Sequence, residues 1–103
     1  MIKKYDQSKI VFDNDGVIGR SITEVGGNEF VHLKLEPGKL VPAHALAIDV
    51  TFFIVSGSGT ISIDGKKIKA EKNDVVFVKS NSQRGWINDG NDVLELFVVK
   101  KLG

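Results

Sequence analysis

The sequence predicts a single all-β domain. Apolar and polar residues alternate with a period of two along most of the chain, and no window carries the apolar stripe of an amphipathic helix. Glycine, asparagine and aspartate interrupt this pattern about every eight to twelve residues, which is the spacing of turns in sandwiches and barrels. A chain of 103 residues can bury one core but not two. We therefore expect one antiparallel β-barrel or sandwich over residues 1–103.

Composition narrows the classes of function. The chain has no cysteine, which excludes disulfides, thiolate metal ligands and cysteine nucleophiles. Its net charge is +1 and its basic residues are dispersed, so nucleic acid and anionic membranes are not expected as partners. The first residues lack the apolar core of a signal peptide, and no apolar run reaches the length of a membrane span. We therefore expect a cytoplasmic protein.

The first third of the chain predicts two strands behind an N-terminal segment. Residues 1–13 are expected to form an arm leading into the barrel or an edge strand, and a polar turn separates them from a strand over 17–25. The next strand, 30–35, alternates clearly and has His32 and Lys34 on one face. Because the lysine marks that face as solvated, we expect His32 to be solvated or packed at an interface and not to be a ligand.

The second half of the chain predicts further strands separated by polar turns. The dipeptide Asp64-Gly65 is typical of a two-residue hairpin. β-Branched and aromatic residues dominate several of the segments between the turns, as they do in buried strands. We expect strands over residues 50–55, 60–63, 66–70, 75–78, 84–88 and 93–100.

Between these groups of strands lies the stretch that contains His44. It opens on the turn Pro37-Gly38 and closes on the turn Gly57-Ser58-Gly59. Pro42 lacks the N–H group that a central strand needs, so His44 should follow an edge or a bend. Since His32 is the only other histidine, a metal site in this chain could hold at most two imidazoles. We expect the chemistry of the protein to lie near His44.

Two stretches resemble the signature motifs of the cupin superfamily. The first has the characteristic spacing at Gly38, His44, Leu46, Val50 and Gly57. The second covers residues 73–88, and residues 35–38 resemble the usual lead-in, so that the resemblance spans residues 30–100. It implies a small antiparallel jelly-roll β-barrel, which agrees with the strands predicted from alternation.

The resemblance also implies a metal site, which this chain has degraded. In cupins the first motif typically offers two histidines and a glutamate, and the second offers one more histidine. Here His44 occupies the first of these positions, but the others hold Leu46, Val50 and Arg84, none of which can coordinate a metal. Asp49 is the one nearby oxygen donor, and alternation turns it away from the face of Val50 unless a bulge intervenes. We expect no metal cofactor; His44 and Asp49 are the only candidate ligands.

Alternation along the two motifs predicts a pocket. It places seven side chains on the faces that would point into the barrel. They are His44, Leu46, Val50 and Phe52 on the first motif, and Arg84, Trp86 and Asn88 on the second. If both faces point inward, they enclose an apolar cavity with a few polar groups near its mouth, which is typical of small-molecule sites. We predict these seven as ligand-binding residues.

Arg84 is the most informative of the seven, because a buried guanidinium needs a partner. One interpretation is that Arg84 and His44 orient a carboxylate or another anionic or polar group, while the two aromatic rings stack on the rest of the ligand. The alternative is that Arg84 lies at the rim and pairs with Asp49, Glu95 or solvent, with no ligand at all.

Three classes of function remain open at this point. The first is metal-independent binding of a small polar or anionic molecule by a sensing or accessory protein. The second is an enzyme, either a metal-dependent dioxygenase or isomerase that completes a site around His44 with other ligands, or a metal-free isomerase or lyase with His44 as the general base. The third is a purely structural interaction module.

The outward positions predict a homodimer. Strands that are apolar on both faces must be covered on both faces, and without helices a second copy of the chain is the simplest cover. Small single-domain cupins are typically dimers, so the resemblance implies the same. The side chains predicted to face outward are Thr51, Phe53, Val76, Val78, Leu94 and Val98.

Overall fold

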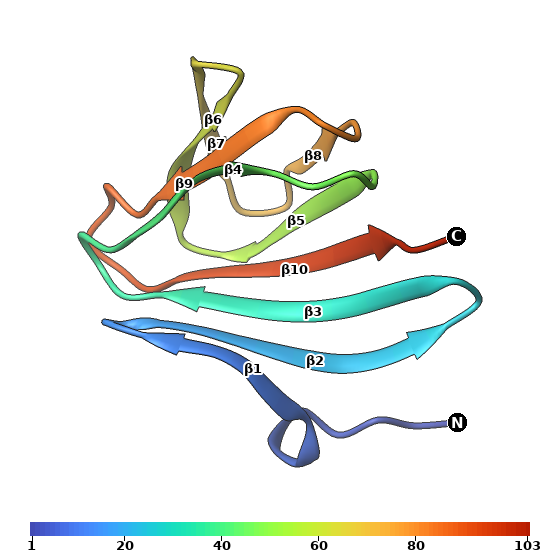
Figure 1. Cartoon of the computed structure of the whole chain (residues 1–103). Coiled ribbons are helices and arrows are strands. Elements are labelled where there is room, and N and C mark those ends of the chain that lie inside the picture. The colour runs from blue at the N-terminus through green and yellow to red at the C-terminus, as the bar shows by residue number, and fades with distance from the viewer.

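The protein consists of ten strands and one short 3-10 turn, and the computed structural model describes all of residues 1–103 (Figure 1). The turn is η1 (Tyr5–Gln7). The strands are β1 (Lys9–Asn14), β2 (Val17–Val25), β3 (Asn28–Leu35), β4 (Leu40–Ala45), β5 (Val50–Ser56), β6 (Ser58–Ile63), β7 (Lys66–Glu71), β8 (Val75–Val78), β9 (Gln83–Ile87) and β10 (Leu94–Lys101). None of its helical segments is long and apolar enough to cross a membrane. The predicted all-β fold is confirmed.

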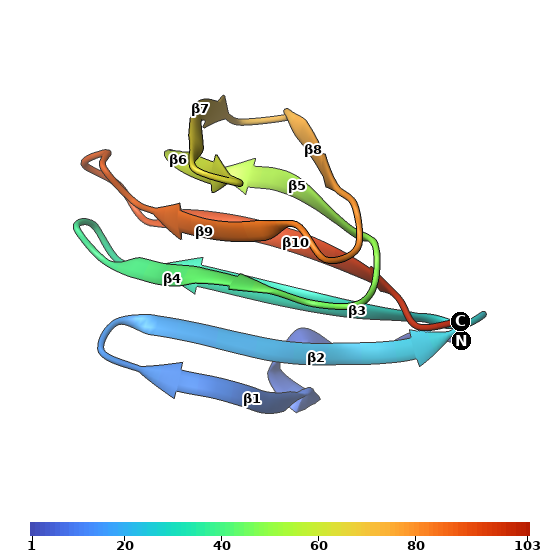
Figure 2. The same ribbon diagram turned by 45° about the horizontal axis from the view of Figure 1, so that its top comes forward.

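The strands form two antiparallel sheets. The larger sheet has the order β1-β2-β3-β10-β5-β8, and the smaller has the order β4-β9-β6-β7. Figure 2 shows β4 and β9 lying in front of β3 and β10, as two layers of one barrel. Because many strands that are neighbours in a sheet are distant in the sequence, the arrangement is a jelly roll, as the resemblance implied.

The core lies between the two sheets. A cluster of 13 buried apolar residues contains Leu35, Ile54 and Leu96 from the larger sheet, together with Ile61 and Trp86 from the smaller one. Alternate side chains of β5 and β10 enter this core, which is the alternation seen in the sequence, whereas β1 and β4 contribute no residue to it. Removal of these side chains from water is the main favourable term in folding.

The outer side of the larger sheet differs in part from the prediction. Phe53 faces outward and is 38% exposed, whereas Val78, Leu94 and Val98 are buried in the core and Val76 packs against it. The prediction for these last four was wrong, because β8 and β10 are apolar on both faces and alternation cannot say which face is inward. The register of each strand against its neighbours settles that question.

The apolar residues that are exposed on β8 are Val75 (63%) and Phe77 (59%). In the sheet they stand opposite Phe53 and Thr51 on β5. Exposed apolar side chains on an edge strand are commonly covered by another chain. This exposure agrees with a homodimer but does not test it, so the homodimer stays a prediction. A monomeric mass in light scattering would contradict it.

The N-terminal residues supply an edge strand and not only an arm. β1 pairs with β2 alone and ends the larger sheet. Val11 is an extra residue in this pairing, since the register shifts between Ile10 and Phe12. A bulge of this kind sends two consecutive side chains to similar directions. Val11 and Phe12 accordingly both reach the same cavity inside the barrel.

A second bulge shapes β4. Val41 stands opposite Trp86 and His44 stands opposite Arg84, so two residues of β4 face the single residue Gly85. The bulge contains Pro42, which has no N–H group to offer to the sheet. Gly85 is required because a Cβ atom there would lie 2.8 Å from the carbonyl oxygen of Val41. The bend predicted before His44 is this bulge, and it sets His44 directly beside Arg84.

His32 lies on the outer side of the larger sheet. Its Nε2 atom is 2.9 Å from Oε2 of Glu95, and its ring meets the ring of Tyr5 edge-on at 4.8 Å between centroids. The side chain is 13% exposed, so it is packed beneath η1 and not freely solvated. The sequence predicts a His32 that is solvated or packed at an interface; in the structure the ring packs within the chain, against Tyr5 and Glu95.

Candidate small-molecule site

A cavity of about 210 Å³ lies between the two sheets, lined by β1, β2, β3, β5 and β10 of the larger sheet and by β4 and β9 of the smaller one. The wall of the cavity is apolar, and its polar side chains come from three strands. The apolar side chains are Val11, Phe12, Val31, Leu33, Val41, Phe52, Trp86 and Val98; the polar ones are His44, Arg84 and Lys100.

Arg84 is the buried polar group of this cavity. It is 5% exposed, and its guanidinium makes no hydrogen bond or ion pair with another protein group. None of its nitrogens is completely buried, so they border the open space of the cavity. Burial lowers the pKa of Arg84, because water is withdrawn from the charged form and no acceptor replaces it. Neither acid named as an alternative partner reaches it. Asp49 accepts a hydrogen bond from the N–H of Ser80 at 2.9 Å, and Glu95 binds His32.

His44 stands beside Arg84 at the mouth of the cavity. Directly opposite residues of an antiparallel pair project to the same side of the sheet. The Nδ1 atom of His44 is 3.0 Å from the carbonyl oxygen of Pro42. Because a carbonyl can only accept, Nδ1 carries the hydrogen and donates it, which leaves Nε2 without a protein partner. The bulge of β4 therefore fixes the tautomer of the imidazole.

Lys100 adds a third basic group, which sequence reasoning missed. It continues the inward series of β10 after Leu96 and Val98, so the same alternation could have found it. No carboxylate lines the cavity. The polar side of the cavity is thus entirely basic, and the rest is apolar. Val11 and Phe12 were also missed, because a bulge in β1 cannot be predicted from the alternation of its residues.

Two aromatic rings form one wall. Phe52 and Trp86 pack edge-to-face with 5.4 Å between their centroids and 72° between their planes. Trp86 is 3% exposed, and its indole Nε1 is buried without a hydrogen-bond partner. Rings in this arrangement form a stiff apolar surface for a ligand to pack on.

Of the seven predicted ligand-binding residues, four line the cavity together: Phe52, His44, Arg84 and Trp86. The other three lie elsewhere. Val50 is 1% exposed in the core, and Leu46 packs against that core. Asn88 lies beyond the end of β9, where strand alternation no longer applies, and its side chain bonds the backbone at the opposite end of the barrel.

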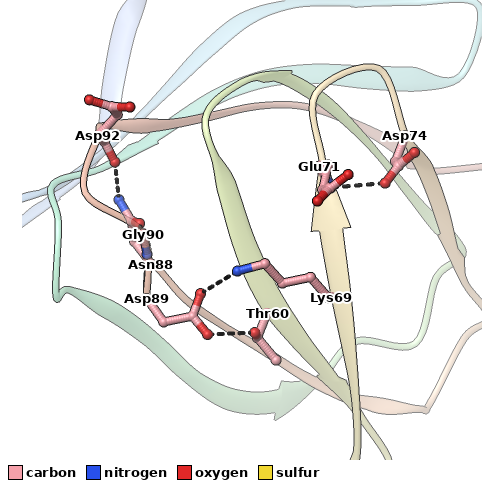
Figure 3. A network of polar contacts seen from close by, with 8 residues as sticks. All are labelled: Thr60, Lys69, Glu71, Asp74, Asn88, Asp89, Gly90 and Asp92. Carbon is pink, nitrogen blue, oxygen red and sulfur yellow. Dashed lines mark hydrogen bonds and ion pairs between the residues drawn. The ribbon is translucent and has the colours of Figure 1, made fainter.

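That opposite end is closed by a network of polar contacts (Figure 3). Asn88 Nδ2 donates to the carbonyl oxygens of Leu35 and Asp92 at 2.9 and 2.8 Å, and the N–H of Gly90 donates to Asn88 Oδ1. Nearby, Asp89 accepts hydrogen bonds from Thr60 and Lys69 (Figure 3). These polar groups bind one another and leave no demand for a ligand.

The donor set does not fit a cupin metal centre. Leu46, Val50 and Arg84 occupy the positions that would hold ligands beside His44, and no group of three or more histidine, aspartate or glutamate side chains could hold a metal ion. Asp49 does not join His44, because its carboxylate binds the Ser80 backbone. Zinc and iron sites need three or four ligands. We derive no chemistry through a metal here.

The two sheets define a jelly-roll β-barrel, and the cavity lies between them. A family model described as "Cupin domain" matches residues 31–100, and the chain belongs to this family. The predicted membership is confirmed. No curated protein matches the sequence.

Solved structures of similar shape include proteins with different names. A predicted oxalate decarboxylase from Thermotoga maritima is 23% identical, with a TM-score of 0.85 and 100% of both chains covered. An RmlC-like cupin from Shewanella frigidimarina is 16% identical, with a TM-score of 0.84 and 97% and 88% coverage of this and that chain. The polyketide cyclase RemF from Streptomyces resistomycificus is 13% identical, with a TM-score of 0.82 and 100% and 81% coverage. At these identities the likeness shows the fold alone.

Proposed function

We propose that this protein binds a small organic anion in the barrel cavity, without a metal, as a sensing or accessory protein. One observation carries the proposal: Arg84 is 5% exposed, lines the cavity and has no acceptor in the protein. A charge in an apolar cavity without a protein acceptor is less well solvated than in bulk water. An anion that enters the cavity would supply the missing acceptor, so its binding would relieve that penalty.

The other groups around Arg84 also favour a negatively charged ligand. His44 and Lys100 are the other polar side chains of the cavity, and neither would repel an anion. No aspartate or glutamate lines the wall, so no negative side chain would repel an anion there. Apolar walls strengthen the attraction because they lower the local dielectric constant.

A fluorescence titration tests the proposal. Trp86 is the only tryptophan of the chain and lines the cavity, so its emission reports on this site. We expect small organic acids to change the emission of the wild type, and the Kd to rise at least about tenfold in Arg84→Gln. The matched control is Arg20→Gln, since Arg20 donates to the carbonyls of Tyr5 and Ser8 outside the cavity. If no acid changes the emission, or if both variants bind like the wild type, the proposal is wrong.

A metal-free isomerase or lyase is the second candidate function. The observation that favours it is the unpartnered Nε2 of His44 beside the cationic Arg84, an arrangement that could remove a proton from a bound anion. No carboxylate orients the imidazole, since Pro42 supplies the only bond to Nδ1. Loss of turnover but not of binding in His44→Gln would support this function, once a substrate has been found.

A further inference from the structure

We infer that the ligand is a monocarboxylate with an apolar body of about one ring, a class to which benzoate belongs. This inference rests on the proposed function and adds the chemical class of the ligand. Three properties of the cavity carry it: the volume, the absence of hydroxyl, amide and carboxylate side chains from the wall, and the single buried positive charge.

The volume sets the size of the ligand. A cavity of about 150 Å³ lined by apolar side chains is large enough to bind benzene. The present cavity of about 210 Å³ can therefore hold one ring together with a carboxylate. It falls below the range of about 300–1,000 Å³ that is usual for drug-sized ligands, so a body of about one ring fits it best.

The wall excludes hydroxylated ligands. No serine, threonine, asparagine, glutamine, aspartate or glutamate side chain lines the cavity. A sugar acid would lose the hydrogen bonds between its several hydroxyl groups and water, and apart from the indole N–H of Trp86 and the groups of His44 and Lys100 the wall has no side chain to replace them. A hydrocarbon ring loses no such bonds and would pack on Phe52 and Trp86, whose own rings meet edge-to-face.

The charge of the site favours one carboxylate over a phosphate or a dicarboxylate. Arg84 is the only buried charge of the cavity, because His44 is exposed and Lys100 is partly exposed. The planar guanidinium can donate two parallel hydrogen bonds to the two oxygens of one carboxylate. A second negative charge would have to give up its hydration with only the solvent-screened groups at the mouth to compensate.

A panel of ligands that differ in one property each tests this class. Benzoate is compared with benzamide, which keeps the ring but is neutral, and with 2-naphthoate, which adds a ring. Glucuronate adds hydroxyl groups, succinate adds a second carboxylate, and inorganic phosphate removes the carbon skeleton. Trp86 emission and isothermal titration calorimetry give Kd for each. We expect benzoate to bind at least about tenfold more tightly than every other member.

Arg84→Met separates recognition of charge from recognition of shape. Methionine keeps an apolar chain of similar length but cannot donate hydrogen bonds. We expect this variant to lose the preference for benzoate over benzamide and to retain the binding of benzamide. Equal benzoate affinity in the variant and the wild type would overturn the inference, because Arg84 would then not hold the carboxylate.

The outcomes distinguish the inference from the proposed function. If succinate or glucuronate binds the wild type but not Arg84→Met, while benzoate does not bind, the inference is wrong and the proposed function stands. If inorganic phosphate alone binds, both the inference and the proposed organic ligand are wrong. If no anion of the panel binds, both fail. If 2-naphthoate or benzamide binds as tightly as benzoate, the size or the charge assignment is wrong, respectively.

Discussion

The two ends of β9 treat a buried polar side chain in opposite ways. Asn88, just past one end, is 0% exposed and makes three hydrogen bonds with backbone groups. Arg84, at the other end, is 5% exposed and makes none. The hydrogen bonds of Asn88 are complete within the fold, so this residue closes the barrel. Those of Arg84 are incomplete, and only a ligand or water can complete them.

This difference distinguishes a polar residue that stabilises the barrel from one that has another role. Nearly all buried polar groups of folded proteins have partners, and each exception requires an explanation. A group with all its partners inside the chain should contribute to stability when it is retained. A buried charge with none should detract from stability, and its retention then indicates another role. The two residues therefore predict substitutions of opposite sign.

The largest effect is expected for Asn88→Leu. Leucine has a similar volume but leaves the carbonyls of Leu35 and Asp92 and the N–H of Gly90 without this partner. Loss of three buried hydrogen bonds at about 1 kcal/mol each predicts a destabilisation of roughly 3 kcal/mol. Urea denaturation measures it. A change below about 1 kcal/mol would contradict the view that this end is held by Asn88.

Gly85→Ala should have the next largest effect. Its Cβ would lie 2.8 Å from the oxygen of Val41 and 2.9 Å from the nitrogen of Ala43, both backbone atoms. The bulge must open, so we expect a loss of about 2 kcal/mol and weaker anion binding, because His44 moves away from the cavity. The control is Gln83→Ala, an exposed position on the same strand, which should stay within about 0.5 kcal/mol of the wild type. Unchanged stability of Gly85→Ala would sink this account of the bulge.

Arg84→Met should stabilise the free protein while it removes anion binding. Replacement of a buried charge by an apolar group of similar shape predicts a gain of about 1 kcal/mol. Arg20→Met is the comparison, because Nη1 of Arg20 donates to two carbonyls and its guanidinium lies 4.8 Å from the centroid of the Tyr5 ring, although its Nε is buried without a partner. That variant should show no gain. A destabilisation of Arg84→Met would mean that Arg84, like Asn88, stabilises the fold.

Alternation and spacing predicted the architecture because each strand buries every second side chain, and they brought together four of the cavity residues. They failed where the period breaks. Bulges in β1 and β4 set Val11 and Phe12 along the cavity and His44 beside Arg84. Asn88 was assigned to the pocket because the end of β9 could not be located from the pattern. The satisfaction of hydrogen bonds, which separates Asn88 from Arg84, depends on loops that only the folded chain brings together.

The smallest predicted effect concerns Asp89, which is adjacent to Asn88 but exposed. The hydrogen bond from Thr60 at 2.7 Å, together with Lys69, lowers the pKa of Asp89 below its ordinary value of 3.8. A lowered pKa in the folded state adds stability above about pH 4, and this stability is lost as the pH falls through the folded value. Because the side chain is 43% exposed and water screens the charges, the gain should be about 0.5 kcal/mol or less. Urea midpoints should therefore show that the stability difference between the wild type and Asp89→Asn shrinks from pH 6 to about pH 2. A stability difference that stays constant or widens on acidification would contradict this prediction. The end of the barrel at Asn88 would then be stabilised by neutral contacts alone.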